Sequence, residues 1–245
     1  MRIDPHTMRV ASSVPVPDPA GVALGGGSLW VTSRASDSVV RIDPQSARTI
    51  GTPIRVGSQP TDVAFAFGSV WTANSADGTV SHIDASGSQP DAPIRVTAHH
   101  PLSPGGTAKS IEQPGDEVLA LTAGANAIWV ATTDQPRTTR QISVSRIDPK
   151  TRAVVGRRIA VTGGVPLRLA AQADAVWATD VGNLVPGSPI RPAQLLRIDP
   201  AGDDLSGPPV RVGHDPGGVT VGLGHVWVAN TADNTISEIL PGGAG

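Results

Sequence analysis

Apolar residues recur at every second position in short stretches that turn residues separate along the whole chain. This period of two predicts β-strands, and no segment keeps the 3.6-residue period of a helix without an intervening Gly or Pro. In the clearest unit, the Gly, Asn, Asp and Ser between the stretches favour turns. The sequence therefore predicts units of four antiparallel strands, which in this unit cover residues 61–66, 70–73, 79–83 and 92–96.

A tryptophan between small apolar residues marks the second strand of each unit. A second phrase, Arg-Ile-Asp-Pro or a variant of it, follows each tryptophan after 11 to 20 residues. Two phrases that recur in register are typical of a repeat array, whose units bury their apolar faces only against one another. The tryptophans are Trp30, Trp71, Trp129, Trp177 and Trp227, separated by 41, 58, 48 and 50 residues.

Four short strands in each repeat of about forty residues predict the blades of a β-propeller rather than two packed sheets. Pro53, Pro93 and Pro208 fall at the outermost strand, an edge position that tolerates a residue without a backbone donor. The tryptophans are interpreted as packing between blades rather than as a carbohydrate site. We predict an all-β chain in which residues 1–245 form a single β-propeller domain of four-stranded antiparallel blades.

The two ends of the chain contribute parts of blades. Residues 2–5 match the end of a third strand, residues 10–16 match an outer fourth strand, and residues 219–240 supply the first three strands of a blade. We expect the N-terminal outer strand to complete the last blade, closing a ring of five blades and removing two open sheet edges. Because residues 2–5 and 236–240 would then compete for one position, a six-bladed propeller is the alternative.

The stretch from Gly218 to Asn230, followed by Asp233 to Ile236, resembles the bacterial YVTN/NHL-type β-propeller repeat, and the resemblance extends over nearly the whole chain. It implies a bacterial protein in an extracytoplasmic or secreted setting. Propellers of this type include secreted binding proteins, sensor domains of actinobacterial serine/threonine kinases, and lyases similar to virginiamycin B lyase. No set of His and acidic residues matches a lyase site, so no catalytic residue is predicted.

Composition excludes several other classes of function. The chain has no cysteine, which rules out disulfides and thiolate metal sites. A net charge of −2 without a basic face argues against nucleic-acid binding. No apolar run is long enough to span a membrane, and the first residues do not form a signal peptide. We expect a monomer without a cofactor or metal, whose targeting segment, if it is exported, would have preceded this sequence.

Three insertions enlarge the repeats, at residues 99–114, 133–141 and 181–194. The first connects two blades and the others connect second to third strands, so the alternation of strand direction puts all three on one face. The opposite face carries short Asp-Pro turns at residues 43–46 and 148–151. Loops lengthen where they carry function, which predicts that the first face binds a ligand or partner, although neutral drift is the alternative.

Polar candidates lie at the start of the innermost strands. The residue before the leading apolar position is expected near the central channel, and in the five repeats it is Gly21, Asp62, Glu117, Arg168 and Gly218. Asp62, Glu117 and Arg168 could bind a small ligand or a peptide, or form ion pairs that only seal the channel. A metal is disfavoured because Arg168 opposes a cation.

Further candidates lie in the insertions. His99 and His100 are predicted to contact a partner rather than a metal, because neighbouring side chains of an extended segment point apart. Arg137 and Asn183 are the candidates in the other two insertions. His214 and His225 have no partner identifiable from spacing. The spacing of Asn74/Asp77 and of Asn230/Asp233 suggests a calcium loop but is interpreted as turn structure.

Three hypotheses follow from these patterns. The first is a binding module, a sensor or interaction domain for a protein or small molecule, that acts through the face with the insertions. The second is a metal-dependent lyase or lactone hydrolase with its site in the central channel. The third is a scaffold that only spaces other domains.

Overall fold

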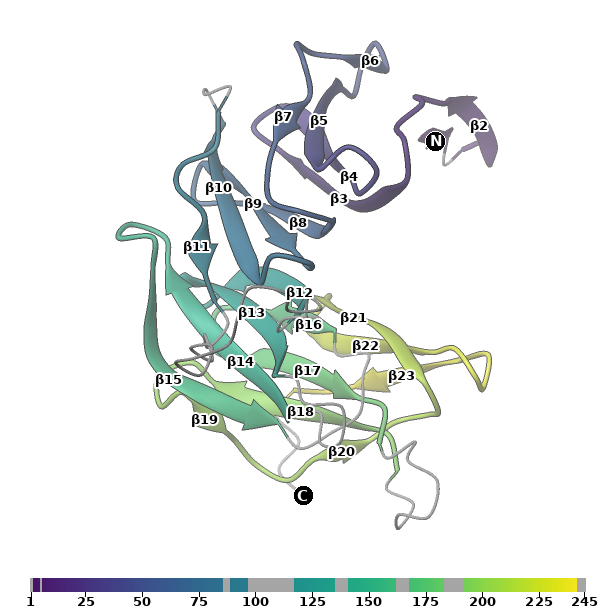
Figure 1. Cartoon of the computed structure of the whole chain (residues 1–245). Helices are drawn as coiled ribbons and strands as arrows, with labels where there is room; N and C mark the ends of the chain where they lie inside the picture. Colours follow the sequence, from purple (N-terminus) through teal and green to yellow (C-terminus); the bar gives the residue numbers. More distant parts are fainter. Residues whose placement is uncertain are drawn as a thin grey trace, which may run out of the picture. The chain divides into compact units, whose positions relative to one another are not determined.

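The computed structural model describes residues 2–4, 6–85, 89–96, 117–134, 141–161, 168–182 and 192–241. It falls into two compact units, Met1–Ile94 and Arg95–Gly245 (Figure 1). Every helix or strand in the described residues is a β-strand, which confirms the all-β prediction. The prediction that residues 1–245 form a single domain stays a prediction.

The first unit contains a hairpin and two larger sheets (Figure 1). We call the hairpin the half-blade and the sheets blade 1 and blade 2. The half-blade is β1 (Arg2–Asp4) and β2 (Arg9–Ser12). Blade 1 is β3 (Pro19–Gly25), β4 (Ser28–Ser33), β5 (Ser38–Asp43), β6 (Arg48–Thr49) and β7 (Ile54–Arg55). Blade 2 is β8 (Pro60–Ala66), β9 (Ser69–Asn74), β10 (Thr79–Asp84) and β11 (Ile94–Arg95), whose last strand reaches the boundary between the units.

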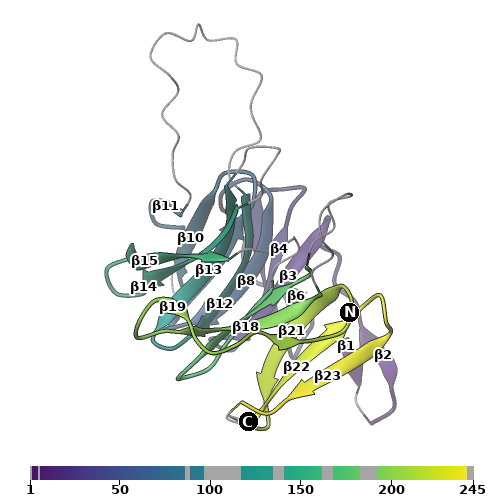
Figure 2. The same cartoon turned by 90° about the horizontal axis from the view of Figure 1, so that it is seen from below.

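The second unit contains three sheets, and blades 3 and 4 lie side by side (Figure 2). Blade 3 is β12 (Glu117–Gly124), β13 (Ala127–Asp134), β14 (Gln141–Asp148) and β15 (Ala153–Val161). Blade 4 is β16 (Leu169–Ala171), β17 (Val176–Asp180), β18 (Gln194–Asp199), β19 (Asp204–Leu205) and β20 (Val210–Arg211). Blade 5 is β21 (Pro216–Gly222), β22 (His225–Asn230) and β23 (Thr235–Ile239).

The antiparallel strand order of the blades is the one that the sequence predicts. Neighbouring strands in the chain pair in each blade, and in blades 1 and 4 the outer strand is divided into two short pieces that pair with the third strand. Pro53, Pro93 and Pro209 immediately precede β7, β11 and β20. The outer strand is therefore short in these blades, because a proline cannot donate a hydrogen bond to the third strand.

The tryptophans of the second strands form the core of the blades. Trp30, Trp71 and Trp129 are fully buried, and Trp30 and Trp129 lie in clusters of buried apolar side chains. In four blades the indole Nε1 donates a hydrogen bond to the carbonyl of the residue five positions earlier, at 3.1 to 3.3 Å. The indole ring is buried while its N–H keeps a hydrogen-bond partner. This explains why tryptophan recurs at this position of the repeat.

Turns between third and fourth strands have one repeated geometry. Each turn begins with an Asp whose carboxylate accepts a hydrogen bond from the backbone N–H of the residue two positions later. These residues are Asp4, Asp43, Asp148 and Asp199. Four residues beyond each Asp, a non-glycine residue has a φ between 50° and 57°. The type I turn that the sequence predicts is therefore followed by a left-handed residue, a common way to close a hairpin.

These turns make stability depend on pH. Hydrogen bonds from the backbone of Thr151 and Lys150 hold the pKa of Asp148 below its ordinary value of 3.8. Backbone hydrogen bonds also lower the pKa of Asp43 and of Asp4. A carboxylate with a lowered pKa in the folded chain stabilises it above the unfolded pKa, and this stability is lost as the pH falls through the folded pKa.

We therefore expect the free energy of unfolding to fall as the pH is lowered from about 5 to about 2.5. The variant Asp148→Asn keeps an acceptor for the turn but removes the titration, so its stability should depend less on pH. Urea unfolding followed by circular dichroism at several pH values measures both slopes. Asp43→Asn combined with Asp148→Asn should flatten the dependence further, and slopes equal to that of the natural sequence would contradict this explanation.

The two ends of the chain pair differently from the expectation. β2 pairs with β1, and blade 5 has three strands in the described residues. The outer strand predicted for residues 10–16 thus finds a partner within its own hairpin, because residues 2–4 precede it at turn distance. Closure of a five-bladed ring by a pair between residues 10–16 and blade 5 stays a prediction.

Candidate functional site

The three long connectors leave blades 2, 3 and 4 at equivalent strand ends. Strand pairing gives the connectors as residues 96–116, 135–140 and 181–193, slightly different from the predicted insertions. The first joins an outer strand to the next innermost strand, and the other two join second to third strands. Because neighbouring strands of a blade run in opposite directions, the second strand and the outer strand finish at the same end of the blade, as the sequence predicts.

Buried polar side chains hold the strand ends from which two of these connectors start. In blade 4 the fully buried carboxylate of Asp180 accepts hydrogen bonds from the backbone of Gly182, at 2.9 Å, and from the side chain of Gln194, at 3.0 Å. In blade 3 the buried Thr132 hydroxyl accepts one from Arg158 at 2.9 Å. The last strand residues before both connectors are therefore fixed in place, although sequence reasoning did not identify them.

Arg168 lies where the sequence predicts, at the start of the innermost strand of blade 4. Its backbone N–H donates to the Thr179 hydroxyl, and its carbonyl accepts from the backbone of Thr179, both at 3.0 Å. Its own side chain is exposed. The backbone is thus fixed, and the guanidinium is presented to solvent at the connector-bearing end of the strands.

Glu117 does not occupy the position equivalent to Arg168, which corrects one prediction. Strand register places Ala120 opposite Ala131, two residues after Trp129, whereas Glu117 lies opposite Thr133 at the first residue of β12. The strand is longer than expected and carries a register shift between Val118 and Ala120. Val118 and Leu119 add an apolar pair at the start of this strand, so the apolar run begins before Ala120, the residue at the equivalent position. Glu117 is exposed at the connector-bearing end, where it stays a candidate for binding.

Asp62 belongs to blade 2 in the first unit and lies at the predicted position, opposite Ala73. One carboxylate oxygen accepts a hydrogen bond from the backbone of Val63 at 2.9 Å. A Cβ on Gly21 would lie 2.9 Å from the Asp62 backbone, so the innermost strands of blades 1 and 2 approach closely here. Four of the predicted candidates, His99, His100, Arg137 and Asn183, lie outside the described residues.

The two Asn/Asp pairs that suggest a calcium loop are turn structure, as predicted. Asn74 donates to the hydroxyls of Thr79 and Ser81, and the Asp77 carboxylate accepts from the backbone of Ser58. Asn230 and Asp233 repeat this arrangement in blade 5. In the residues that the structure describes, no group of three or more His, Asp or Glu side chains is arranged to hold a metal.

Besides the exposed His6, whose Nδ1 lies 3.6 Å from Asp4, three histidines of the described residues pair with carboxylates. The Nδ1 atom of His82 lies 2.5 Å from a carboxylate oxygen of Asp91. That of His214 lies 2.9 Å from Asp233, and that of His225 lies 2.5 Å from Glu238. The rings of His82 and His225 also lie against Trp71 and Trp227. These partners come from neighbouring strands or loops and are distant in sequence, which is why spacing did not reveal them.

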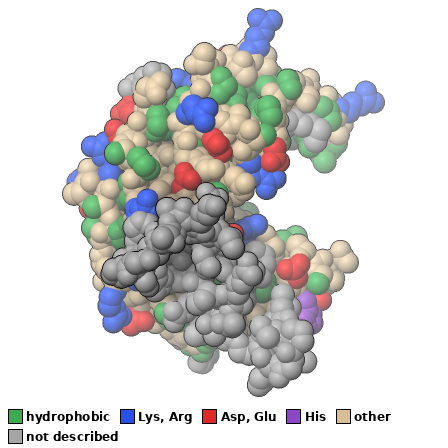
Figure 3. Space-filling view, viewed as in Figure 1, with side chains coloured by type: hydrophobic (Ala, Val, Ile, Leu, Met, Phe, Trp, Pro, Cys, Tyr) green, Lys and Arg blue, Asp and Glu red, His purple; other side chains and the backbone are tan. Residues whose placement is uncertain are grey.

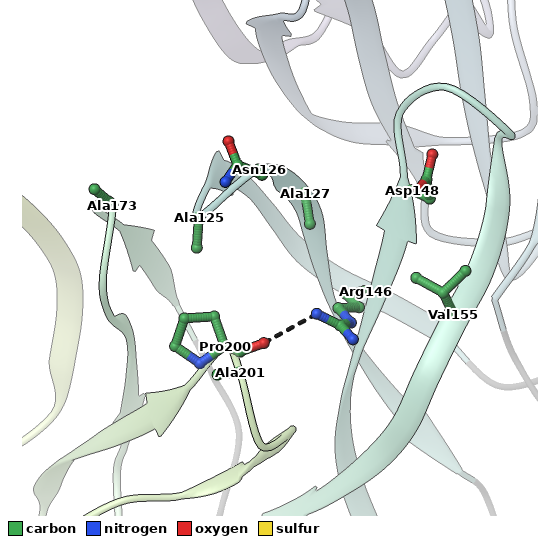
Figure 4. Close-up of a pocket in the computed structure, with 9 residues that line it drawn as sticks. All are labelled: Ala125, Asn126, Ala127, Arg146, Asp148, Val155, Ala173, Pro200 and Ala201. Atoms are coloured by element: carbon green, nitrogen blue, oxygen red, sulfur yellow. Dashed lines mark hydrogen bonds between the residues drawn. The ribbon is translucent and has the colours of Figure 1, made fainter.

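A hollow of about 520 Å³ lies between blades 3 and 4, at the strand ends opposite the long connectors (Figure 4). Small side chains line most of it. Arg146 also lines the hollow. Its guanidinium donates a hydrogen bond to the carbonyl of Pro200 at 2.9 Å and lies 3.0 Å from the Asp203 carboxylate. Because Arg146 already has both partners, we interpret this contact as a fastening between the two blades.

Charged side chains of both signs are interspersed on the face drawn in Figure 3. Among the described side chains drawn there, Asp and Glu lie between Lys and Arg, without a patch of a single sign. Of the residues that the structure describes, none belongs to a helix able to cross a membrane.

Comparison with known proteins identifies the fold. No protein-family model matches the chain, and no curated protein matches its sequence. Among solved structures, hydrazine synthase of Kuenenia stuttgartiensis is 16% identical with a TM-score of 0.63, over 98% of this chain and 88% of that one. Virginiamycin B lyase of Staphylococcus aureus is 14% identical with a TM-score of 0.58, over 92% and 71%. A chain of a nidogen/laminin complex is 13% identical with a TM-score of 0.59, over 94% and 82%.

These matched structures are β-propellers. The class of this protein is therefore an all-β propeller with five blades of the four-stranded antiparallel type. At such low identity the likeness defines the fold and carries no information about activity.

Proposed function

We propose that the chain is a binding module whose contact surface is the end of blades 3 and 4 that bears the long connectors. One observation carries the proposal. The connectors 96–116, 135–140 and 181–193 all meet one end of blades 3 and 4, whereas the opposite ends of these two blades are closed by turns of two to four residues. A rigid set of strands that presents long loops on one side is typical of binding proteins.

The strand ends support this assignment. Asp180 and Thr132 fix the last residues before two connectors, while Arg168 and Glu117 project exposed charges of opposite sign beside them. A fixed backbone with exposed charged side chains suits a polar partner such as a peptide, because less conformational freedom is lost on binding. We propose that His99, His100, Arg137 and Asn183 add contacts from the connectors, and that Asp62 is a binding residue of blade 2 by itself. The extracytoplasmic setting and the sensor role that the sequence resemblance implies belong to this proposal.

Peptides selected from a random phage-displayed library against the whole chain provide a defined probe. We expect the selected peptides to compete with one another and to lose about tenfold or more in affinity when Arg168 is changed to Ala, as for loss of a charged hydrogen bond in a contact. Lys150→Ala is the matched control, because Lys150 is an exposed cation in the turn at the opposite strand ends. Surface plasmon resonance measures both affinities.

Binding that depends on Lys150 and tolerates Arg168→Ala would show that the face is wrongly assigned. Failure to select any competing peptides would favour the scaffold hypothesis. The hypothesis of a metal-dependent lyase or lactone hydrolase would require dependence on calcium or magnesium, which unfolding with and without EDTA detects as a shift in Tm.

A further inference from the structure

An aromatic ring lies between blades 1 and 2 in the first unit. A Cβ on Gly25, at the end of β3, would lie 2.5 Å from the Cβ of Phe65. A Cβ on the next residue, Gly26, would lie 3.0 Å from two ring carbons of Phe65 and 3.7 Å from the Cβ of Ala85. The ring of Phe65 therefore lies between the first turn of blade 1 and the residue that follows the third strand of blade 2.

Blades 3 and 4 repeat this backbone arrangement with an alanine at the position of Phe65. Strand register makes Ala171 equivalent to Phe65, because each pairs with the residue before the tryptophan of its blade. Gly124 is equivalent to Gly25, because the carbonyl of each accepts the indole hydrogen bond. A Cβ on Gly124 would lie 2.6 Å from the Cβ of Ala171. The two alternatives thus share the same close approach, but alanine carries no ring.

The hollow of about 520 Å³ between blades 3 and 4 lies at the position that the ring takes in the first unit (Figure 4). Ala125, which is equivalent to Gly26, lines it from blade 3. Pro200, which follows the third strand as Ala85 does, lines it from blade 4. Replacement of a phenylalanine by an alanine between two such positions explains why the hollow exists.

The walls of the hollow belong to the second unit alone. Every residue that lines it is part of blade 3 or blade 4. Trp129 of blade 3 packs with Leu169 and Leu196 of blade 4 in one buried cluster, which fixes the two blades against each other. The shape of the hollow is therefore set by packing within one compact unit.

The polar groups of the hollow favour an uncharged ligand. A guanidinium has five N–H donors, and the contacts of Arg146 with Pro200 and Asp203 use two of them. The other N–H groups can donate to a ligand oxygen. The charge of Arg146 is balanced by Asp203, and the carboxylate of Asp148 also lines the hollow, so an anion would be repelled.

We propose that this hollow binds a small uncharged aromatic molecule with a hydroxyl group, a phenol. The ring takes the place that Phe65 takes in the first unit, between Ala125 and Pro200. Its hydroxyl oxygen accepts a hydrogen bond from Arg146, and Asp148 supplies an acceptor for its hydrogen. A preformed hollow with apolar walls and a few polar groups is typical of small-molecule sites. The site lies at the strand ends opposite the proposed peptide surface and is independent of it.

The test titrates 4-fluorophenol with the whole chain and follows the fluorine resonance by NMR, where we expect a saturable change. Ala125→Gly combined with Ala171→Phe rebuilds the arrangement of the first unit and fills the hollow with a ring. This double variant should bind the probe about tenfold more weakly or worse. It should also raise Tm by about 2–4 °C, as filling a cavity stabilises the fold. Ala125→Gly alone is the matched control, because it leaves the hollow open and should bind as the natural chain does.

Two further probes test the assigned chemistry. Fluorobenzene has the ring without the hydroxyl and should bind about tenfold more weakly than 4-fluorophenol, the loss expected for a hydrogen bond to a charged group. 4-Fluorobenzoate carries a negative charge and should also bind more weakly. If the benzoate binds more tightly than the phenol, the hollow is an anion site and the proposal is wrong.

The remaining outcomes also decide the matter. Absence of saturable binding by 4-fluorophenol overturns the proposal, and so does binding that the double variant leaves unchanged. If the double variant does not fold, Ala173→Leu narrows the hollow from the first turn of blade 4 and has to weaken binding in its place. Peptides selected against the ends that bear the connectors should bind the double variant with unchanged affinity, so the two proposals fail separately.

Discussion

Replacement of Trp129 by Ala is expected to lower the free energy of unfolding by about 3–5 kcal/mol, the cost of emptying a large buried aromatic site. Trp129 is fully buried in a cluster that includes Ile142, Val144 and Leu169. The substitution also leaves the carbonyl of Gly124 without the indole donor that lies at 3.1 Å. Chemical unfolding followed by circular dichroism measures the change without relying on tryptophan fluorescence.

Trp227→Ala is the matched control for burial. Trp227 makes the same hydrogen bond, to Gly222, but it lies in a three-stranded blade and remains partly exposed. The same substitution should therefore cost less there, because a smaller cavity is created. Equal losses at both positions would mean that the buried cluster around Trp129 contributes less to stability than its packing indicates.

Gly156→Ala is the second substitution for which we expect a large loss of stability. Gly156 has a φ of 73°, and a Cβ there would lie 2.0 Å from an Asp203 carboxylate oxygen. Asp203 is buried, accepts a hydrogen bond from the backbone of Arg157 at 3.1 Å and pairs with Arg146. The methyl group would displace a buried charge from its partners, for which we expect about 3 kcal/mol or more, since breaking a buried pair is costly.

Gly207→Ala separates backbone strain from the displaced carboxylate. Gly207 has a φ of 74°, and no atom lies within 4 Å of the position that its Cβ would take. Its substitution should cost only about 1 kcal/mol, the strain of a left-handed conformation. The difference in urea midpoint between the two variants isolates the contact with Asp203. If both variants unfold at the same midpoint, the fastening between blades 3 and 4 does not stabilise the chain.

Strand periodicity and the repeated tryptophans were sufficient to predict the blades. Their strands depend on local alternation and on turn residues, which a sequence shows directly. The predicted strand at residues 70–73 differs by one residue at each end from β9 (Ser69–Asn74). The Asp-Pro turns were likewise predicted, but the left-handed residues that end them, such as Ala47 and Arg152, were not. Tertiary pairing imposes that conformation on residues that do not favour it.

The candidate site was only partly predictable. Arg168 and Asp62 were located because they precede an apolar residue with a clear place in the repeat. Glu117 was assigned to the wrong position because Val118 and Leu119 extend the apolar run at the start of β12. The other candidates lie nine residues before their tryptophans, the spacing at which β12 has Ala120. Asp180 was missed because its role depends on Gln194, which is fourteen residues away and reaches it only after β17 and β18 pair.

The most direct test of the proposed binding surface exchanges whole connectors. Residues 96–116 are replaced by the short connector Val212–Asp215 of the same chain, which joins blades 4 and 5 at the equivalent strand ends. In the control, the turn Pro149–Arg152 is replaced by the turn Pro44–Ala47, which has the same geometry at the opposite ends. We predict that the selected peptides no longer bind the first variant and bind the second with unchanged affinity. Full binding to the first variant together with loss of binding to the second would contradict the account.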